Sequence, residues 1–176
     1  MKSLLGRLKL IDHITTELPI EKRDFVSKLK SSVDQGNTGL LFSAFEAFSS
    51  SKNEYKGMVT HDSFKIRRRR RLFDMSIGLA VAEGSFRQKD NLLVIDSTIK
   101  GFHGIFIPII IFVALFYIAF ILVSIFSEAP GNIEWIFIIF VPFHAAIMLG
   151  IPYFIMRRGV SRMKYELERD FFYMTK

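Results

Sequence analysis

Two long apolar segments, Ile105–Phe126 and Trp135–Met156, dominate the pattern of hydrophobic and polar positions along the chain. Neither contains Asp, Glu, Lys or Arg, and the residues between them, Ser127–Glu134, are more polar. A helix rises about 1.5 Å per residue, so each segment is long enough to cross a hydrocarbon core of roughly 30 Å. The pattern therefore predicts a transmembrane helical hairpin.

The spacing of apolar residues changes repeatedly ahead of this hairpin. Residues Leu4–Leu18 mix apolar and polar positions and favour a strand. A period near 3.6 then predicts an amphipathic helix over Glu21–Val33. Helical spacing over Leu40–Phe48 predicts a further short helix, which either packs on its own domain or lies on the membrane surface.

The stretch that follows alternates between apolar and polar residues, which is typical of strands. Two β-hairpins are predicted. The first joins Tyr55–Thr60 to Phe64–Arg69 through the turn 61–63, and the second joins Ile77–Arg87 to Asn91–Lys100 through the turn 88–90. Together they predict an antiparallel meander of four strands.

The C-terminal segment has one continuous apolar helical face. Its residues recur at intervals of three and four and are Val160, Met163, Leu167, Phe171 and Met174. A four-stranded sheet needs a cover for its apolar side, and this face can supply it. We therefore expect an α+β membrane protein with a small antiparallel-sheet domain over residues 1–104, the hairpin over 105–156, and a C-terminal amphipathic helix over 157–176 packed on the sheet.

The net charge of +7 is distributed unevenly. Residues 1–104 carry 18 Lys and Arg against 12 Asp and Glu, residues 157–176 carry six against three, and residues 127–134 carry two Glu and no basic residue. Basic segments beside a span stay in the cytoplasm. We expect a two-pass protein of the bacterial inner (cytoplasmic) membrane with both termini inside. Charges interrupt residues Met1–Ile20, so no cleavable signal is expected.

Polar and small residues inside the hairpin are candidates for function or packing. His144 is ionisable and lies near the predicted midplane, so it is either part of a proton or ion path or a neutral imidazole bonded to a backbone carbonyl. Pro142 and Pro152 remove backbone hydrogen bonds within the second span. Ala146 and Gly150 form a small-xxx-small pair that predicts close packing of the two helices.

Five consecutive arginines, Arg67, Arg68, Arg69, Arg70 and Arg71, lie on a predicted strand. Alternation places the first, third and fifth on one face and the other two on the opposite face, in phase with the apolar residues that precede them. At least one side is then strongly cationic and can bind anionic lipid headgroups or another anionic ligand. A solvated edge strand is the alternative. Nucleic acid has less support, because no aromatic-basic motif accompanies the run.

Catalytic and metal-binding patterns are weak in this sequence. The chain has no cysteine, which excludes disulfides, thiol catalysis and cysteine-ligated metals. The neighbours His61, Asp62 and Ser63 contain the residue types of a triad, but adjacent turn residues do not converge on one reacting atom. The four histidines show no metal-ligand spacing. We expect no catalytic residue, no metal and no cofactor.

Several short motifs resemble those of a group of small uncharacterised bacterial membrane proteins. They are Phe64-Lys-Ile-Arg-Arg-Arg, Gly84-Ser-Phe, Ile99-Lys-Gly running into Ile105, and the closing helix Tyr165-Glu-Leu-Glu-Arg-Asp-Phe-Phe. The resemblance covers roughly residues 54–175 and implies a short antiparallel β domain, two transmembrane helices and a terminal helix. Strands closed by a C-terminal helix are also loosely similar to pleckstrin-homology-like domains.

These patterns favour a non-enzymatic binding or scaffold protein of the inner membrane, whose basic cytosolic surface meets anionic lipid or an acidic ligand. The alternative is an accessory subunit of a larger membrane complex, assembled through the hairpin. The expected partners are the lipid bilayer, anionic headgroups, and other membrane subunits or a second copy of the chain.

Overall fold

The computed structural model describes residues 2–39, 51, 53–69, 79–102, 104, 106–126 and 134–176. The chain forms two compact units. The first, here called the sheet unit, combines Met1–Phe102 with Met156–Lys176, and the second, the hairpin unit, is His103–Ile155. The short helix predicted over Leu40–Phe48 lies outside the described residues.

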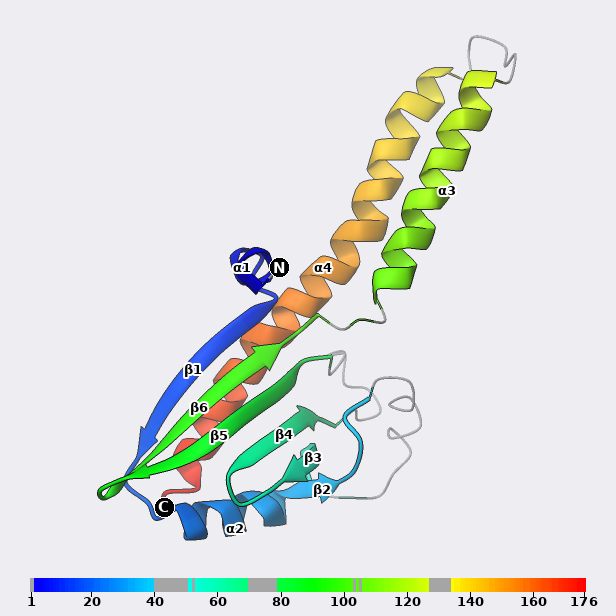
Figure 1. Ribbon diagram of the computed structural model, residues 1–176. Coiled ribbons are helices and arrows are strands. Elements are labelled where there is room, and N and C mark those ends of the chain that lie inside the picture. Colours follow the sequence, from blue (N-terminus) through cyan, green and yellow to red (C-terminus); the bar gives the residue numbers. More distant parts are fainter. Residues whose placement is uncertain are drawn as a thin grey trace. The chain divides into compact units, whose positions relative to one another are not determined.

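The described helices and strands follow one another in a mixed order (Figure 1). They are α1 (Lys2–Arg7), β1 (Ile11–Leu18), α2 (Lys22–Ser32), β2 (Val33–Gln35), β3 (Tyr55–Val59), β4 (Ser63–Arg68), β5 (Val81–Lys89), β6 (Leu92–Lys100), α3 (Phe106–Phe126) and α4 (Glu134–Tyr173). The strands form one sheet in the order β1-β6-β5-β4-β3-β2. Neighbouring strands are antiparallel except for β2 and β3, which are parallel. The α+β class predicted from the sequence is confirmed.

The predicted four-strand meander is present as β3 to β6, and the structure adds a strand at each edge. At one edge, β1 pairs along its whole length with β6, from Ile11 opposite Lys100 to Leu18 opposite Leu93. The prediction of a strand from Leu4 was too long, because the first residues form α1. That helix ends where Lys9 adopts a left-handed backbone conformation with φ of 56°. The strand can therefore begin only after this turn.

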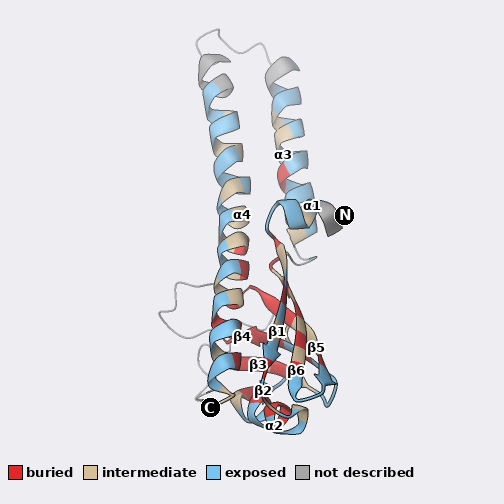
Figure 2. Ribbon diagram, turned by 90° about the vertical axis from the view of Figure 1, so that its left-hand side faces the viewer, coloured by how far each residue is buried: buried red, intermediate tan, exposed pale blue. Residues whose placement is uncertain are grey.

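Among the described residues, one apolar core lies between the sheet and two helices (Figure 2). From α2, which the sequence predicted, Phe25, Val26 and Leu29 are buried. From the C-terminal segment, Val160, Met163, Leu167 and Phe171 belong to the core, and Met174 packs against it. The apolar helical face predicted for this segment is thus the one that meets the sheet. The sheet side that faces these helices is called the inner face below.

The sequence predicts a separate C-terminal helix, but the described residues show none. The C-terminal segment is the last part of α4, which runs without interruption from Glu134 to Tyr173 and includes Pro142 and Pro152. Gly159 does not end the helix, because one interior glycine costs only about 1 kcal/mol. Burial of the neighbouring Val160, which is 2% exposed, offsets a cost of this size.

The hairpin unit contains α3 and the first part of α4. Two helices of the described chain are long and apolar enough to cross a membrane, with candidate spans over Phe106–Val123 and Ile139–Tyr173. Only 6% of the most apolar window in each is buried within the protein. A helix in the core of a soluble protein would be mostly buried, whereas the described residues leave these apolar surfaces largely uncovered.

Candidate functional site: the outer face of the sheet

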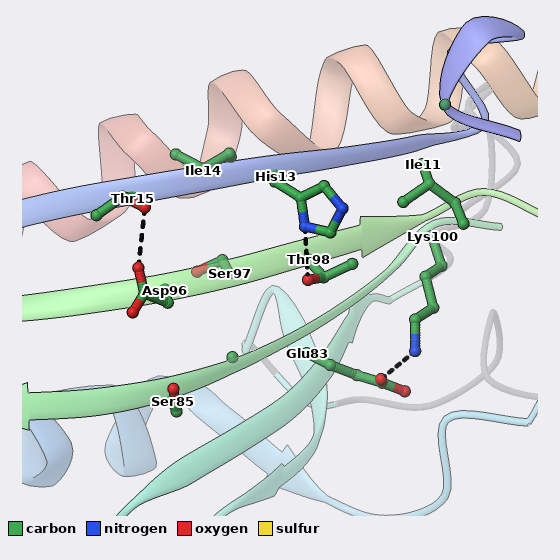
Figure 3. A pocket seen from close by; sticks show the side chains of 12 residues that line it. Ile11, His13, Ile14, Thr15, Glu83, Ser85, Asp96, Ser97, Thr98 and Lys100 are labelled. Carbon is green, nitrogen blue, oxygen red and sulfur yellow. Dashed lines mark hydrogen bonds and ion pairs between the residues drawn. The ribbon is translucent and has the colours of Figure 1, made fainter. Parts of the chain in front are cut away.

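Alternate residues of β1, β5 and β6 point away from the core and form a polar outer face. A hollow of about 600 Å³ lies over this face (Figure 3). Seven polar residues of the outer face line this hollow: His13 and Thr15 from β1, Glu83 and Ser85 from β5, and Asp96, Thr98 and Lys100 from β6. The pairing of β1 with β6 brings these residues together across more than 80 positions of sequence.

Both carboxylate oxygens of Asp96, which lines the hollow, contact a neighbouring side chain. Thr15 Oγ1 donates a hydrogen bond to Asp96 Oδ1 at 2.9 Å, and the Arg87 guanidinium forms an ion pair with Asp96 Oδ2. The hydrogen bond from Arg87, with that from Thr15, lowers the pKa of the Asp96 carboxyl. The carboxylate therefore stays ionised at neutral pH, and both of its oxygens are already occupied.

Glu83 is the second carboxylate of the outer face and lies on β5 opposite Thr98. Its Oε1 lies 2.9 Å from Lys65 Nζ, which comes from β4, and its Oε2 accepts a hydrogen bond from Lys100 Nζ of β6. The hydrogen bond from Lys100 is the largest cause that lowers the pKa of Glu83. One carboxylate thus holds two lysines from the strands on either side of it.

Of the charged residues that line the hollow, Lys100 is a cation and Glu83 and Asp96 are carboxylates, and two further cations, Lys65 and Arg87, pair with these carboxylates from outside the lining. Lys65, Arg87 and Lys100 face two carboxylates, those of Glu83 and Asp96. The three cationic side chains are 53%, 71% and 42% exposed, so each keeps a solvent-accessible part beside its ion pair. Other polar groups complete the surface: the His13 ring and the Thr98 hydroxyl share a hydrogen bond of 3.0 Å, and the Ser85 side chain is exposed. The arrangement can bind an anion with several hydrogen-bond acceptors.

The arginine run does not form the exposed cationic strand face that its sequence predicts. Arg67 is completely buried and Arg69 is 7% exposed. Arg69 Nη1 lies 2.5 Å from Asp34 Oδ2, which belongs to β2. Arg70 and Arg71 lie outside the described residues. The expectation of an accessible basic face is therefore wrong for Arg67 and Arg69, because both side chains are buried.

Arg68 points to the inner face, as the predicted alternation requires, and there it meets α4. It forms an ion pair with Glu166, whose side chain is only 9% exposed. Glu166 Oε1 also accepts a hydrogen bond of 2.8 Å from Arg162 Nε, one turn earlier in α4. Arg68 therefore ties the sheet to the helix instead of facing solvent.

In the hairpin unit, His144 has a specific partner that sequence analysis missed. Its Nδ1 lies 2.6 Å from the hydroxyl of Tyr117 on α3, and its ring stacks on Phe140 at a centroid distance of 5.3 Å. The alternative of a bond to a backbone carbonyl is replaced by this side-chain contact. No sequence signal marked Tyr117, because only the pairing of the two helices brings it opposite His144.

Ala146 and Gly150 do not bring the helices of the hairpin unit into close contact. Ala146 is exposed, and a Cβ added at Gly150 would meet no atom within 4 Å. A close approach of two helices at a glycine leaves no such space. The predicted packing role within this hairpin is therefore wrong at Gly150.

The residues His61, Asp62 and Ser63 form a turn and not a triad. His61 Nδ1 lies 3.0 Å from Asp62 Oδ1, but the Ser63 hydroxyl pairs with Thr60 Oγ1 at 2.9 Å. Asp62 Oδ1 also accepts a hydrogen bond of 2.5 Å from Lys22 Nζ. In the part of the chain that the structure describes, no three His, Asp or Glu residues gather in a way that could hold a metal ion.

No family model, curated protein or solved structure matches this chain. The resemblance to small bacterial membrane proteins stays a prediction.

Proposed function

We propose that the protein is a membrane-anchored, non-enzymatic binding module that holds an anionic ligand in the hollow on the outer face of its sheet. The observation that carries this proposal is a group of three cations against two carboxylates: Lys100 lines the hollow, and Lys65 and Arg87 pair with its lining residues Glu83 and Asp96. The ligand class is the one expected from the sequence, but the basic surface is a different one. It comes from three separate strands instead of from the arginine run.

The ligand chemistry follows from what the hollow already satisfies. Asp96 and Glu83 are each held by two donors, so neither carboxylate needs a bound cation. Ammonium and guanidinium groups carry several donors each, and hydroxyls add further ones. A phosphate group, with charge and several acceptor oxygens, fits these donors. Such a group can belong to a small soluble molecule or to a lipid headgroup.

Membrane anchoring is supported by the exposed apolar surfaces of α3 and of the first part of α4. The charge distribution supports an orientation with both termini in the cytoplasm of a bacterium, because the segment 127–133 carries no Lys or Arg. The absence of native cysteine makes this testable. Ser127→Cys should react with a membrane-impermeant maleimide from outside intact cells, and Lys30→Cys only after permeabilisation. The reverse pattern would overturn the orientation.

Ligand binding is tested on the full chain in nanodiscs of zwitterionic lipid, with inorganic pyrophosphate as the probe in calorimetric titrations. Lys65→Gln with Lys100→Gln should weaken binding at least tenfold. The matched control removes two exposed cations of α2, through Arg23→Gln and Lys30→Gln, and should leave binding unchanged. Ser85→Leu fills the hollow without removing a charge and should also weaken binding at least tenfold.

Two further arms separate the sources of phosphate. If the ligand is a headgroup, nanodiscs containing phosphatidylglycerol should lower the apparent affinity for pyrophosphate in the wild type, and Ser85→Leu should remove this competition. If the ligand is soluble, the lipid composition should have no effect. Equal pyrophosphate affinity in wild type, Ser85→Leu and the lysine variant, or no binding at all, would refute the proposal.

An accessory subunit of a membrane complex is the second candidate, favoured by the contact between Tyr117 and His144. A polar pair among apolar helices is a common means of fixing how membrane helices associate. Purification from native membranes in mild detergent should then recover a stoichiometric protein partner, and His144→Phe should reduce its yield. Recovery of the chain alone from native membranes would count against this candidate.

A further inference from the structure

The side of α4 opposite the core carries an unusual row of residues. Its members recur at alternating intervals of four and three, and we call them the α4 seam: Arg158, Arg162, Tyr165, Arg169, Phe172 and Lys176. The last lies three residues beyond the end of α4, with its ammonium 5.4 Å from the ring centre of Phe172. Figure 2 shows exposed residues along this part of the helix. Tyr165 is 67% exposed and Phe172 is 58% exposed.

This spacing is that of the contact positions in a coiled coil, where a second helix packs along the seam. Large aromatic side chains in such a seam provide the anchors of many interfaces. The opposite side of α4 is already used, since Val160, Met163, Leu167 and Phe171 fill the core. The seam is thus a second contact surface of the same helix, on its solvent side.

The charge of the seam selects among occupants. Four of its six residues are cations and none is a carboxylate. Two copies of the chain packed along this seam would bring eight cationic side chains together, in either relative direction of the helices, of which Arg162 and Arg169 of each copy pair with Glu166 and Asp170 of their own helix. Like charges facing each other disfavour such pairing. An acidic partner helix would instead gain attraction at each of these positions.

Two of the arginines are already oriented for such contacts. Arg162 Nε donates to Glu166 Oε1 at 2.8 Å, and Arg169 Nη2 lies 2.8 Å from Asp170 Oδ1. These carboxylates hold the guanidinium groups in place while both side chains stay about two-fifths exposed, at 39% and 43%. Less side-chain entropy is then lost when a partner binds.

A lipid surface fits the seam less well than a helix does. Helices that lie in the membrane interface bury a broad apolar face, with their charged residues on the opposite side. Here the broad apolar face of α4 is buried against the sheet, and the outward seam alternates cations with only two aromatic rings. A narrow mixed seam is instead what a single partner helix covers.

We infer that the α4 seam binds an acidic amphipathic helix of a partner protein. Apolar residues of that helix cover Tyr165 and Phe172, while its Asp and Glu residues pair with Arg162 and Arg169. This interaction is independent of the proposed ligand site, because α4 covers the inner face of the sheet and the hollow lies on the outer face.

The test places the photo-crosslinking residue p-benzoylphenylalanine at Tyr165 of the full chain in native membranes, with the same residue at Lys30 of α2 as the site control. Crosslinked peptides are identified by mass spectrometry. The expected product joins Tyr165 to a helical segment of another protein, with acidic residues spaced to face the seam. A synthetic peptide of that segment should bind the purified chain in nanodiscs.

Charge reversal then tests the proposed contacts. Arg162→Glu with Arg169→Glu should weaken peptide binding at least tenfold, and replacing the facing acidic residues of the peptide by Lys should restore it. Arg158→Glu with Lys176→Glu provides a second pair that leaves the contacts to Glu166 and Asp170 intact, and it too should weaken binding. The control pair Arg23→Glu with Lys30→Glu should not.

Three results would overturn the inference. They are crosslinks from Tyr165 only to lipid, crosslinks only to a second copy of this chain, and no crosslink beyond that of the Lys30 control. Peptide binding that both seam variants leave unchanged would also contradict it. None of these results bears on pyrophosphate binding, so the two proposals fail separately.

Discussion

Replacing Phe171 by Ala should strongly destabilise the sheet unit. Phe171 is 2% exposed and makes edge-to-face contacts with Phe25 at 5.3 Å and with Phe64 at 5.9 Å between ring centres. Removing a buried phenylalanine costs about 3 to 5 kcal/mol in unfolding free energy, through lost burial and the cavity that remains. Two aromatic contacts are lost with it, so we expect about 4 kcal/mol.

The neighbouring Phe172 is the matched control, since it has the same chemistry but is 58% exposed. Phe172→Ala should change the unfolding free energy by no more than about 0.5 kcal/mol. The assay is pulse proteolysis of the full chain in nanodiscs across a urea series. Tryptophan fluorescence is unsuitable, because the single Trp135 lies in the hairpin unit. If the two variants differ by less than about 1 kcal/mol, the packing of α4 on the sheet described above is refuted.

Three further predictions use the same assay. Gly84→Ala should destabilise the sheet unit by about 1 to 3 kcal/mol, because its Cβ would lie 2.7 Å from the Asp96 carbonyl oxygen; wild-type stability would contradict this close approach. Arg68→Ala should lower the unfolding free energy by about 2 to 3 kcal/mol, because it leaves Glu166 with fewer cationic partners. The same substitution in a Glu166→Gln background should lower it by less. Equal losses in the two backgrounds would show that Arg68 and Glu166 do not interact. Burial, reinforced by the hydrogen bond to Asp170, raises the pKa of Tyr55. The wild type should therefore lose stability as the pH rises above the ordinary tyrosine pKa near 10.0, and Tyr55→Phe should lack this part of the loss. Identical alkaline stability profiles of the two proteins would refute the prediction.

Local periodicity explains why much of the fold could be predicted. The alternation over β3 to β6, the period of α2 and the apolar face ending at Met174 each require only neighbouring residues to be read. The two helices that are long and apolar enough to cross a membrane follow from length and composition alone. None of these features depends on which distant segment lies alongside.

The arginine run shows a feature that local periodicity does not predict, namely the partners of side chains. Strand alternation correctly placed Arg68 on the inner face, but it could not show that Arg68 would pair there with Glu166, 98 residues later in the chain. It also could not show that Arg69 would reach Asp34 on β2, a strand of three residues that is too short to carry a pattern. The partners of these arginines come from distant parts of the chain, so strand alternation alone could not predict them.

The candidate site was decided by tertiary structure for the same reason. The sequence by itself determined that β5 and β6 alternate polar with apolar residues, and so that one side of the sheet would be polar. It did not determine that β1 pairs with β6 and places His13 and Thr15 beside Thr98 and Asp96. Strand order depends on which distant edges meet, and this is settled by the free energy of the whole packed unit and not by any local pattern.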